Sequence, residues 1–284
     1  MTDSPSLSVL ATSFNSIAAL YATARPDYPA ALFDAVEELA GRPLAGADVL
    51  DVGAGTGIAT RLLRERGARV TAVEPGSGMA AQLRADQPDL PLVRADGNAL
   101  PFTLETADFV TYAQAWHWTD PERSLPEAIR VLREGGALAL WWNKPDLGVR
   151  WAAEQQERLR TRLAGFHSHG ISRRSTTETI MGRSGARLRV VEHELRWTRR
   201  VSLDGHLANL ATHSYFSVLG RQERDALLAD ERAELLKFHP DGIVDEPYRV
   251  DLTVAIKAKA EGEADHRTYW ASRDGKPRPT PQHR

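Results

Sequence analysis

The stretch Val49–Gly57, VLDVGAGTG in one-letter code, decides the fold of this chain. It begins as an apolar strand, reaches an acidic residue, and then turns with a glycine at every second position. The apolar residues that follow, Ile58, Ala59, Leu62 and Leu63, share one face of a helix. Because glycine adopts positive φ angles and lets a ligand approach the main chain, this unit predicts a nucleoside-cofactor loop at the carboxyl end of a parallel strand.

The spacing of the glycines indicates which cofactor the loop holds. A dinucleotide loop, G-x-G-x-x-G, would place its third glycine at position 58, where this chain has Ile58. A phosphate-binding P-loop would need a Lys after the glycines, but the nearest cation is Arg61, inside the helix. The loop therefore favours a cofactor without phosphates, S-adenosylmethionine. A tight strand-to-helix turn in some other α/β protein is the alternative at this point.

Two further strands also end in acidic residues. The strand of residues 68–75 ends with Glu74 and Pro75, and that of residues 92–98 reaches Asp96. An acid at the tip of the second strand is well placed to accept hydrogen bonds from ribose hydroxyls, and Asp96 to hold the adenine amino group. A fourth strand is expected at residues 109–112 and a fifth at 137–142. Each acid alone is more typical of a helix N-cap, but together they favour a ligand site at the carboxyl edge of the sheet.

Four motifs carry a family resemblance. LDVGAGTG (50–57), VEP (73–75), ADGNALPF (95–102) and LREGGALAL (132–140) resemble the ordered motifs of class I S-adenosylmethionine-dependent methyltransferases. Within that family, residues 21–29 and AQAWHWTD (113–120) are similar to the small-molecule branch of type 11 methyltransferases, which includes trans-aconitate methyltransferase-like proteins. The resemblance covers about residues 15–145, so it does not extend to the identity of the substrate.

The resemblance implies an α/β fold with a Rossmann-like, doubly wound sheet of seven strands, N-terminal helices and an inserted helical lid. We expect an N-terminal helical segment at residues 1–44 and a methyltransferase domain at 45–258, with the insert at about 201–245. The polar residues 259–284 are expected to be disordered. Individual elements are expected as helices at 14–21, 29–40, 151–163 and 222–238, and as strands at 188–197 and 248–256.

Composition narrows the classes of function. Lys and Arg number 36 and Asp and Glu 38, a balance of −2, so there is no basic footprint for nucleic acid. The chain has no cysteine, which excludes disulfides and thiolate metal sites. It also lacks an apolar run of about 18 residues, and its polar N-terminus does not resemble a secretion signal. We expect a cytoplasmic enzyme for a small-molecule substrate, a monomer or homodimer, with no metal, membrane or nucleic-acid partner.

The motifs and the resemblance together assign the candidate site. The expected cofactor-binding residues are Asp51, Gly53, Ala54, Gly55, Thr56, Gly57, Glu74, Pro75, Met79, Asp96, Gly97, Asn98 and Ala113, with Arg25 for the methionine carboxylate. The expected acceptor-binding residues are Tyr21, Tyr28, Trp116, Trp118, His213 and Tyr215. The alternatives are a rigid Pro-bounded elbow for the Arg25 segment, and core positions for the tryptophans and the residues of the insert.

His117 is the candidate catalytic residue, a general base, because the ordinary pKa of histidine lies near neutrality. The alternative is a histidine that orients the loop, and a carboxylate acceptor would need no base at all. The segment after the fourth strand lacks the Asn/Asp-Pro-Pro-Tyr/Phe motif of nucleic-acid amine methyltransferases. The predicted activity is therefore methyl transfer to an O or N atom of a small organic acceptor, with S-adenosylhomocysteine as the second product. A non-catalytic cofactor-binding regulator and an NAD-dependent oxidoreductase are the alternatives.

Overall fold

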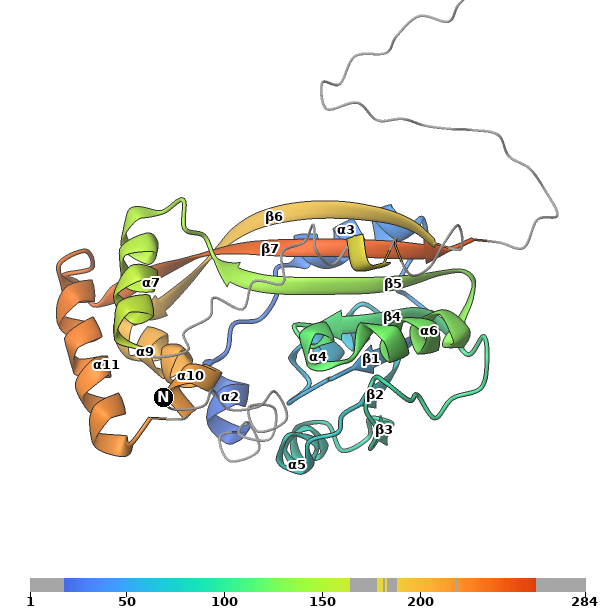
Figure 1. Ribbon diagram of the computed structural model, residues 1–284, viewed down its shortest axis with the longest axis horizontal. Coiled ribbons are helices and arrows are strands. Elements are labelled where there is room, and N and C mark those ends of the chain that lie inside the picture. The colour runs from blue at the N-terminus through green and yellow to red at the C-terminus, as the bar shows by residue number, and fades with distance from the viewer. Residues whose placement is uncertain (1–17, 164–177, 181, 183–187, 218, 259–284) are drawn as a thin grey trace, which may run out of the picture.

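The computed structural model describes residues 18–163, 178–180, 182, 188–217 and 219–258. Its strands form one sheet in the order β3-β2-β1-β4-β5-β7-β6 (Figure 1). The strands are β1 (Asp48–Val52), β2 (Arg69–Val73), β3 (Leu92–Val93), β4 (Ala107–Ala113), β5 (Leu132–Pro145), β6 (Leu188–Ser202) and β7 (Ile243–Lys257). Strands β1 to β5 are parallel, and β7 is antiparallel to both β5 and β6. The predicted α/β, Rossmann-like, seven-stranded fold is confirmed.

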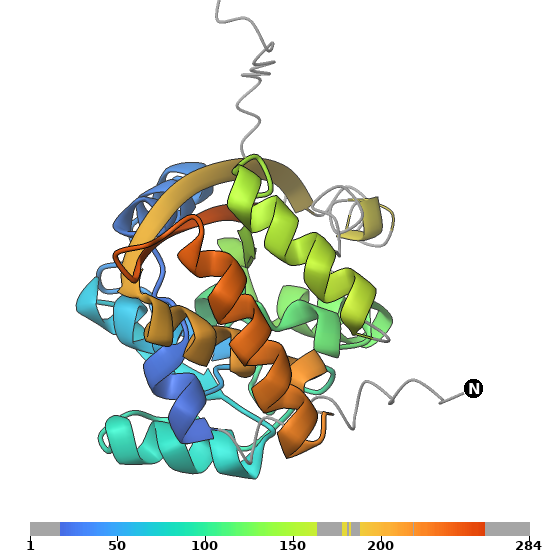
Figure 2. The same cartoon turned by 90° about the vertical axis from the view of Figure 1, so that its left-hand side faces the viewer.

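Helices flank the sheet and gather at one end of it (Figures 1 and 2). They are α2 (Ala18–Ala24), α3 (Ala30–Ala40), α4 (Ile58–Glu65), α5 (Ser77–Asp86), the 3-10 helix η2 (Trp116–Trp118), α6 (Pro121–Val131), α7 (Arg150–Arg162), α9 (Leu203–Ala211), α10 (Ser214–Ser217) and α11 (Arg221–Leu236). The last three lie between β6 and β7, and we call them the helical insert. Helix α2 packs against both α9 and α5, so it lies between the insert and the glycine-loop half of the molecule.

The sheet buries both of its faces, which is why its central strands are almost wholly apolar. Val49 of β1 points to the face covered by α3 and α4, where it joins a cluster with Leu32 and Leu63. Its neighbour Leu50 points to the opposite face and packs in a second cluster with Leu125 of α6. A third cluster holds the insert against α7, so the insert has an apolar core of its own.

Several element boundaries differ from the sequence-based expectation. The sixth and seventh strands, expected at 188–197 and 248–256, are longer, because β6 and β7 pair with each other from Leu188↔Lys257 to Ser202↔Ile243. The first described helix is α2, Ala18–Ala24, where the sequence predicted a helix at 14–21. The expected disordered tail and the start of the N-terminal segment lie outside the described residues.

Asp108, at the start of β4, binds residues of neighbouring segments at the amino end of the sheet. Its carboxylate accepts a hydrogen bond from the Asp48 backbone N–H at 2.9 Å and from Arg42 at 2.7 Å. Arg133, at the start of β5, lies 3.0 Å from the same carboxylate. Burial alone would raise the pKa of Asp108, but the Asp48 N–H and the two arginines outweigh it and hold this pKa below its ordinary value.

We expect Asp108→Asn to lower the free energy of unfolding at pH 7 by about 1–3 kcal/mol, since the negative charge beside two arginines and one of two acceptor oxygens are lost. The folded-state pKa lies below the ordinary value of 3.8, so this contribution is complete above pH 3.8 and is lost as the pH falls through the folded-state pKa. Urea unfolding of both proteins between pH 7 and pH 3 measures the difference. A difference that is absent at pH 7, or constant with pH, would contradict the role of Asp108. Asp89→Asn, which removes an exposed ion pair with Arg64, is the control.

Candidate active site

The three glycines after β1 have different surroundings. All have positive φ angles, 70° at Gly53, 60° at Gly55 and 89° at Gly57. A Cβ on Gly53 would lie 2.4 Å from the Cβ of Ala115, and one on Gly57 would lie 2.3 Å from Leu83 Cδ1. On Gly55, by contrast, it would meet no atom of the described chain within 4 Å. The outer glycines therefore allow close packing, and the middle one presents its main chain to open space.

Glu74 follows β2 and contacts this loop directly. Glu74 is 6% exposed. Its carboxylate accepts hydrogen bonds from the backbone N–H of Gly55 at 2.8 Å and from that of Gly76 at 2.6 Å. Burial raises the pKa of Glu74, and these two hydrogen bonds offset only part of the effect. The acid predicted to bind ribose thus lies beside Gly55, the glycine of this loop that faces open space.

Asp51 lies beneath the loop and is fully buried. One carboxylate oxygen accepts from the Thr60 hydroxyl of α4 at 2.6 Å, and the other from the Thr111 hydroxyl of β4 at 2.8 Å. Burial raises the pKa of Asp51, although both hydroxyls act in the opposite direction. Its cofactor contact stays a prediction; in the structure Asp51 joins β1, α4 and β4.

The third acidic segment forms a tight turn after β3. Asp96 is exposed, and its carboxylate accepts from the Asn98 backbone N–H at 2.7 Å. The Asn98 side chain in turn accepts from the Asp120 N–H at 2.8 Å. A Cβ on Gly97 would lie 2.9 Å from the hydroxyl of Tyr112, so the turn packs directly on β4. Asp96 and Asn98 are therefore held at the same edge of the sheet as the glycine loop.

The remaining expected cofactor residues border the loop. Thr56 is 5% exposed, and its hydroxyl has no hydrogen-bond partner in the part of the chain that the structure describes. Ala54 and Met79 are buried, Ala113 is half-buried at the end of β4, and Pro75 is exposed. An unpartnered buried hydroxyl and open space over Gly55 both fit the binding of a polar nucleoside group.

Gln114, directly after β4, is a candidate that sequence reasoning missed. Its φ of 55° is unusual for a residue with a side chain. The backbone N–H donates to Trp141 O at 2.9 Å, and the side-chain amide lies 3.5 Å from the Tyr28 hydroxyl. Strained backbone of this kind is concentrated at functional sites, but no sequence pattern announces it in a glutamine.

The tryptophans of η2 lie in different environments. Trp116 is 2% exposed and packs edge-on against Tyr112, with 5.0 Å between ring centroids, which favours the core alternative for this residue. Trp118 is half-buried and contacts the ring of His117 at 4.5 Å. Trp118 therefore has accessible ring surface, and the acceptor-binding roles of both tryptophans stay predictions.

His117 is half-buried, and its Nδ1 receives a hydrogen bond. The donor is the indole Nε1–H of Trp142 on β5, at 3.2 Å. Because an indole nitrogen can only donate, Nδ1 must be the unprotonated nitrogen, and the neutral ring carries its proton on Nε2. A base that accepts a proton through Nε2 would first have to change tautomer and lose this hydrogen bond. The general-base role of His117 stays a prediction, with this constraint.

Three predicted site residues from distant parts of the chain, Tyr21, His213 and Tyr215, meet around a fourth, Arg25. The Arg25 guanidinium lies over the ring of Tyr21, 4.8 Å from its centroid, and its Nη1 lies 3.3 Å from His213 Nε2. Because arginine only donates, His213 Nε2 accepts, and its Nδ1–H donates to the Tyr215 hydroxyl at 3.1 Å. Arg25 forms no ion pair with a carboxylate within the described ranges, and its buried Nε has no partner there.

Tyr28 connects this cluster to the glycine loop. It packs edge-on against Trp141 of β5, with 5.7 Å between ring centroids. Burial raises the pKa of Tyr28, and the neighbouring Tyr21 and the Asp51 carboxylate act in the same direction. Through Trp141 and Gln114, Tyr28 joins the segment that carries Arg25 to β5 and to the end of β4, beside the strand that leads into the loop.

Two absences concern only the residues that the structure describes. They contain no group of three or more His, Asp or Glu side chains suited to hold a metal ion. None of their helices combines the length and the apolar character needed to cross a membrane.

Comparison with known proteins gives the family. A family model of a methyltransferase domain matches residues 50–140. The chain is 35% identical to an uncharacterized methyltransferase of Mycobacterium tuberculosis over 231 residues. This match covers 81% of this chain and 88% of the relative.

Solved structures agree on the fold. The chain is similar to phosphoethanolamine N-methyltransferase 2 of Haemonchus contortus in complex with S-adenosyl-L-methionine, with a TM-score of 0.54 and 14% identity over 90% of this chain and 61% of that one. It is also similar to the cyclase SpnF, with a TM-score of 0.54 and 17% identity over 90% and 98% of the two chains. At these identities the likeness concerns the fold alone.

The position of Glu74 leads to a prediction. Glu74→Ala should raise the dissociation constant for S-adenosylmethionine at least about tenfold, because a buried carboxylate acceptor beside Gly55 is lost. Isothermal titration measures this constant. Glu37→Ala is a matched control, since Glu37 also accepts a backbone N–H, that of Leu44 at 2.7 Å, but lies away from the loop. An unchanged constant in Glu74→Ala would exclude the ribose role.

Proposed function

Because this chain belongs to the S-adenosylmethionine-dependent methyltransferases, we propose that it transfers a methyl group to an oxygen or nitrogen atom of a small organic acceptor. The observation that carries the proposal is the Glu74 carboxylate, bonded at 2.8 Å to the N–H of Gly55, where the loop faces open space. An anionic acceptor of hydrogen bonds beside exposed main chain suits a ribose.

We assign the cofactor as follows. Glu74 accepts hydrogen bonds from the ribose, the main chain at Gly55 lies along the nucleoside, and Asp96 lies at the adenine end. Arg25, which has no described ion-pair partner, binds the methionine carboxylate through a charge-assisted contact. When bound, S-adenosylmethionine supplies a methyl group on a sulfonium, and the protein's contribution is mainly to position the acceptor against it.

The acceptor site in this proposal is lined by rings. Tyr21, Tyr28 and Trp118 come from the N-terminal segment and η2, and His213 and Tyr215 from the insert, all of them half-buried. Such walls suit a small organic molecule, and a formal charge of −2 supports no nucleic-acid partner. The trans-aconitate-like branch, the cytoplasmic location and the monomer or homodimer stay predictions.

His117 has two candidate roles, one with the tautomer seen here and one after a change of tautomer. The Nε2–H donates a hydrogen bond to the acceptor or the loop, or the ring changes tautomer and removes a proton from a hydroxyl or amine. A carboxylate acceptor needs only the first role, because its oxygen is already ionised. Which role applies therefore depends on the chemical class of the acceptor.

The first test is binding. Isothermal titration with S-adenosylmethionine, S-adenosylhomocysteine and NADH should give micromolar dissociation constants for the first two and no heat for NADH. Methyl-labelled cofactor should then label a small carboxylic acid, phenol or amine. Binding of NADH alone would overturn the proposal in favour of an oxidoreductase. Cofactor binding without transfer to any of these acceptor classes would favour the non-catalytic regulator.

His117→Ala gives the second test. If His117 is the base, turnover should fall by about 10²–10⁴-fold, with cofactor affinity unchanged. Single-turnover rates with the labelled cofactor measure the effect, and a titration of each variant checks its affinity. A fall of less than about threefold would exclude the base role and leave only an orienting one.

A further inference from the structure

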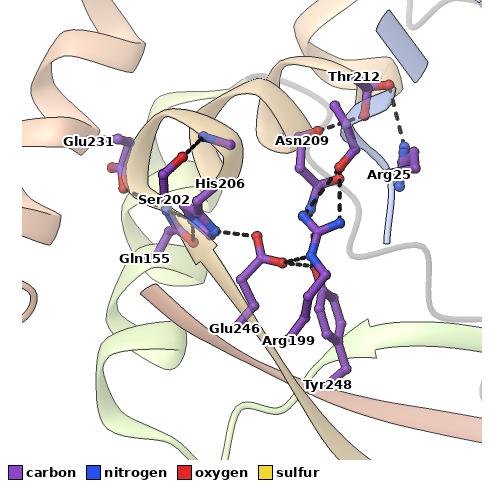
Figure 3. A network of polar contacts seen from close by, with 12 residues as sticks. Arg25, Gln155, Arg199, Ser202, His206, Asn209, Thr212, Glu231, Glu246 and Tyr248 are labelled. Atoms are coloured by element: carbon purple, nitrogen blue, oxygen red, sulfur yellow. Dashed lines mark hydrogen bonds and ion pairs between the residues drawn. The ribbon is translucent and has the colours of Figure 1, made fainter. Parts of the chain in front are cut away.

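A closed ring of polar contacts joins the end of α2 to the helical insert, and its two arms meet at Glu246 of β7 (Figure 3). Glu246 is 2% exposed. One carboxylate oxygen lies 2.7 Å from Nδ1 of His206. The other accepts from Arg199 Nε at 2.7 Å and from the Tyr248 hydroxyl at 2.9 Å. We call the residues linked through this carboxylate the Glu246 ring; they are Glu246, His206, Arg199, Tyr248, Asn209, Thr212, Ala24 and Arg25.

One side of the Glu246 ring reaches α2 through Arg199. While its Nε holds Glu246, its Nη1 and Nη2 donate to the carbonyl of Ala24 at 3.3 and 3.2 Å. Ala24 is the last residue of α2 and directly precedes Arg25. A planar guanidinium can bind both partners at once, because its donors are fixed in a fork. Arg199 therefore fixes the backbone from which Arg25 extends.

The other side returns from Arg25 to the same carboxylate. Arg25 Nη2 donates to Thr212 O at 3.4 Å, and the Thr212 hydroxyl donates to Asn209 O at 2.6 Å. The Asn209 side-chain amide then donates to the Tyr248 hydroxyl at 3.0 Å, which itself donates to Glu246. The backbone and the guanidinium of Arg25 are thus held by two arms that start from one buried carboxylate.

We propose that Arg199 and Glu246 are positioning residues that hold Arg25 at the site, and so make α2 and the helical insert act as one unit. The inference rests on the proposed function, in which Arg25 binds the carboxylate of the cofactor. Arg199 and Glu246 touch neither cofactor nor acceptor in this arrangement; they act through Arg25.

The charges of the Glu246 ring favour this arrangement at neutral pH. Burial alone would raise the pKa of Glu246, but His206, Arg199 and the Tyr248 hydroxyl outweigh it and hold this pKa below its ordinary value. The carboxylate is therefore ionised and can accept from all three donors. Removing Glu246 would leave the guanidinium of Arg199 without its ion-pair partner at a largely buried position, which is costly.

A matched ion pair joins α7 to the insert. Gln155 links its Glu231 to His206, but the hydrogen bonds of the pair itself, among the described residues, join no residue of α2. Arg158 of α7 binds Glu231 of α11 through two hydrogen bonds, 2.9 and 2.8 Å long. Glu231 is 1% exposed, and the Arg158 side chain is 23% exposed, against 20% for that of Arg199. Arg158→Lys therefore reproduces the chemical change of Arg199→Lys in an equally buried ion pair.

The experiment is a double-mutant cycle of Arg199→Lys with Arg25→Ala, with Arg158→Lys as control. Lysine retains the charge beside Glu246 but cannot reproduce the fork to Ala24 O. Arg199→Lys should raise the dissociation constant for S-adenosylmethionine at least about fivefold, and only where Arg25 is present; in the Arg25→Ala background it should add less than about twofold. Arg158→Lys should change the constant less than about twofold.

Amide hydrogen exchange of residues 18–25 is the second readout and needs no ligand. It should be faster in Arg199→Lys than in the wild type and unchanged in Arg158→Lys. If Arg199→Lys does not fold, Tyr248→Phe replaces it, since it interrupts only the second arm and should raise the constant in the same Arg25-dependent way.

Two results would overturn the inference: effects of Arg199→Lys and Arg25→Ala that simply add, or equal effects of Arg199→Lys and Arg158→Lys on both readouts. A wild-type protein that binds no S-adenosylmethionine would instead contradict the proposed function. In that case hydrogen exchange still decides whether Arg199 holds the end of α2.

Discussion

The burial of the Asp51 carboxylate is the constraint on which the site depends. A carboxyl group in the interior is tolerated when its oxygens are hydrogen-bonded, and here the hydroxyls of Thr60 and Thr111 each donate to one of them. These two residues come from α4 and β4, so one carboxylate fixes the strand before the glycine loop, the helix after it and the neighbouring strand. The loop is therefore rigid at both ends, and Gly55 in its middle is the part open to a ligand.

The three acids at the strand tips, similar in sequence, lie at three different depths. Asp51 is fully buried, Glu74 bridges the loop with 6% exposure, and Asp96 is exposed. The depth follows from the position of each strand, since β1 lies between β2 and β4 while β3 is at the edge of the sheet. The acid inside the sheet supports the loop, and in the proposed function the acids nearer the edge contact the cofactor. One sequence pattern thus produces both kinds of role.

Local patterns predicted the sheet, the glycine loop and the acidic strand tips, because each depends on residues close together in the chain. The remaining features depend on long-range contacts. Arg25 and His213 are 188 positions apart, so no spacing could indicate that they meet. The φ of 55° at Gln114 accompanies a hydrogen bond of its N–H to Trp141 on β5, and the acceptor role of His117 Nδ1 comes from an indole on the same strand. The lengths of β6 and β7 come from their mutual pairing, which extends beyond their apolar cores.

The fold alone does not determine the reaction. The chain is as similar in structure to the cyclase SpnF as to an N-methyltransferase, each with a TM-score of 0.54. What distinguishes chemistry on a shared sheet is the set of side chains facing the bound molecules. In the proposed function those side chains come mainly from the N-terminal segment, η2 and the helical insert, and the Glu246 ring connects α2 to the insert. On this proposal, specificity for the acceptor depends on elements whose mutual position is set by one buried carboxylate on β7, well away from the glycine loop in sequence.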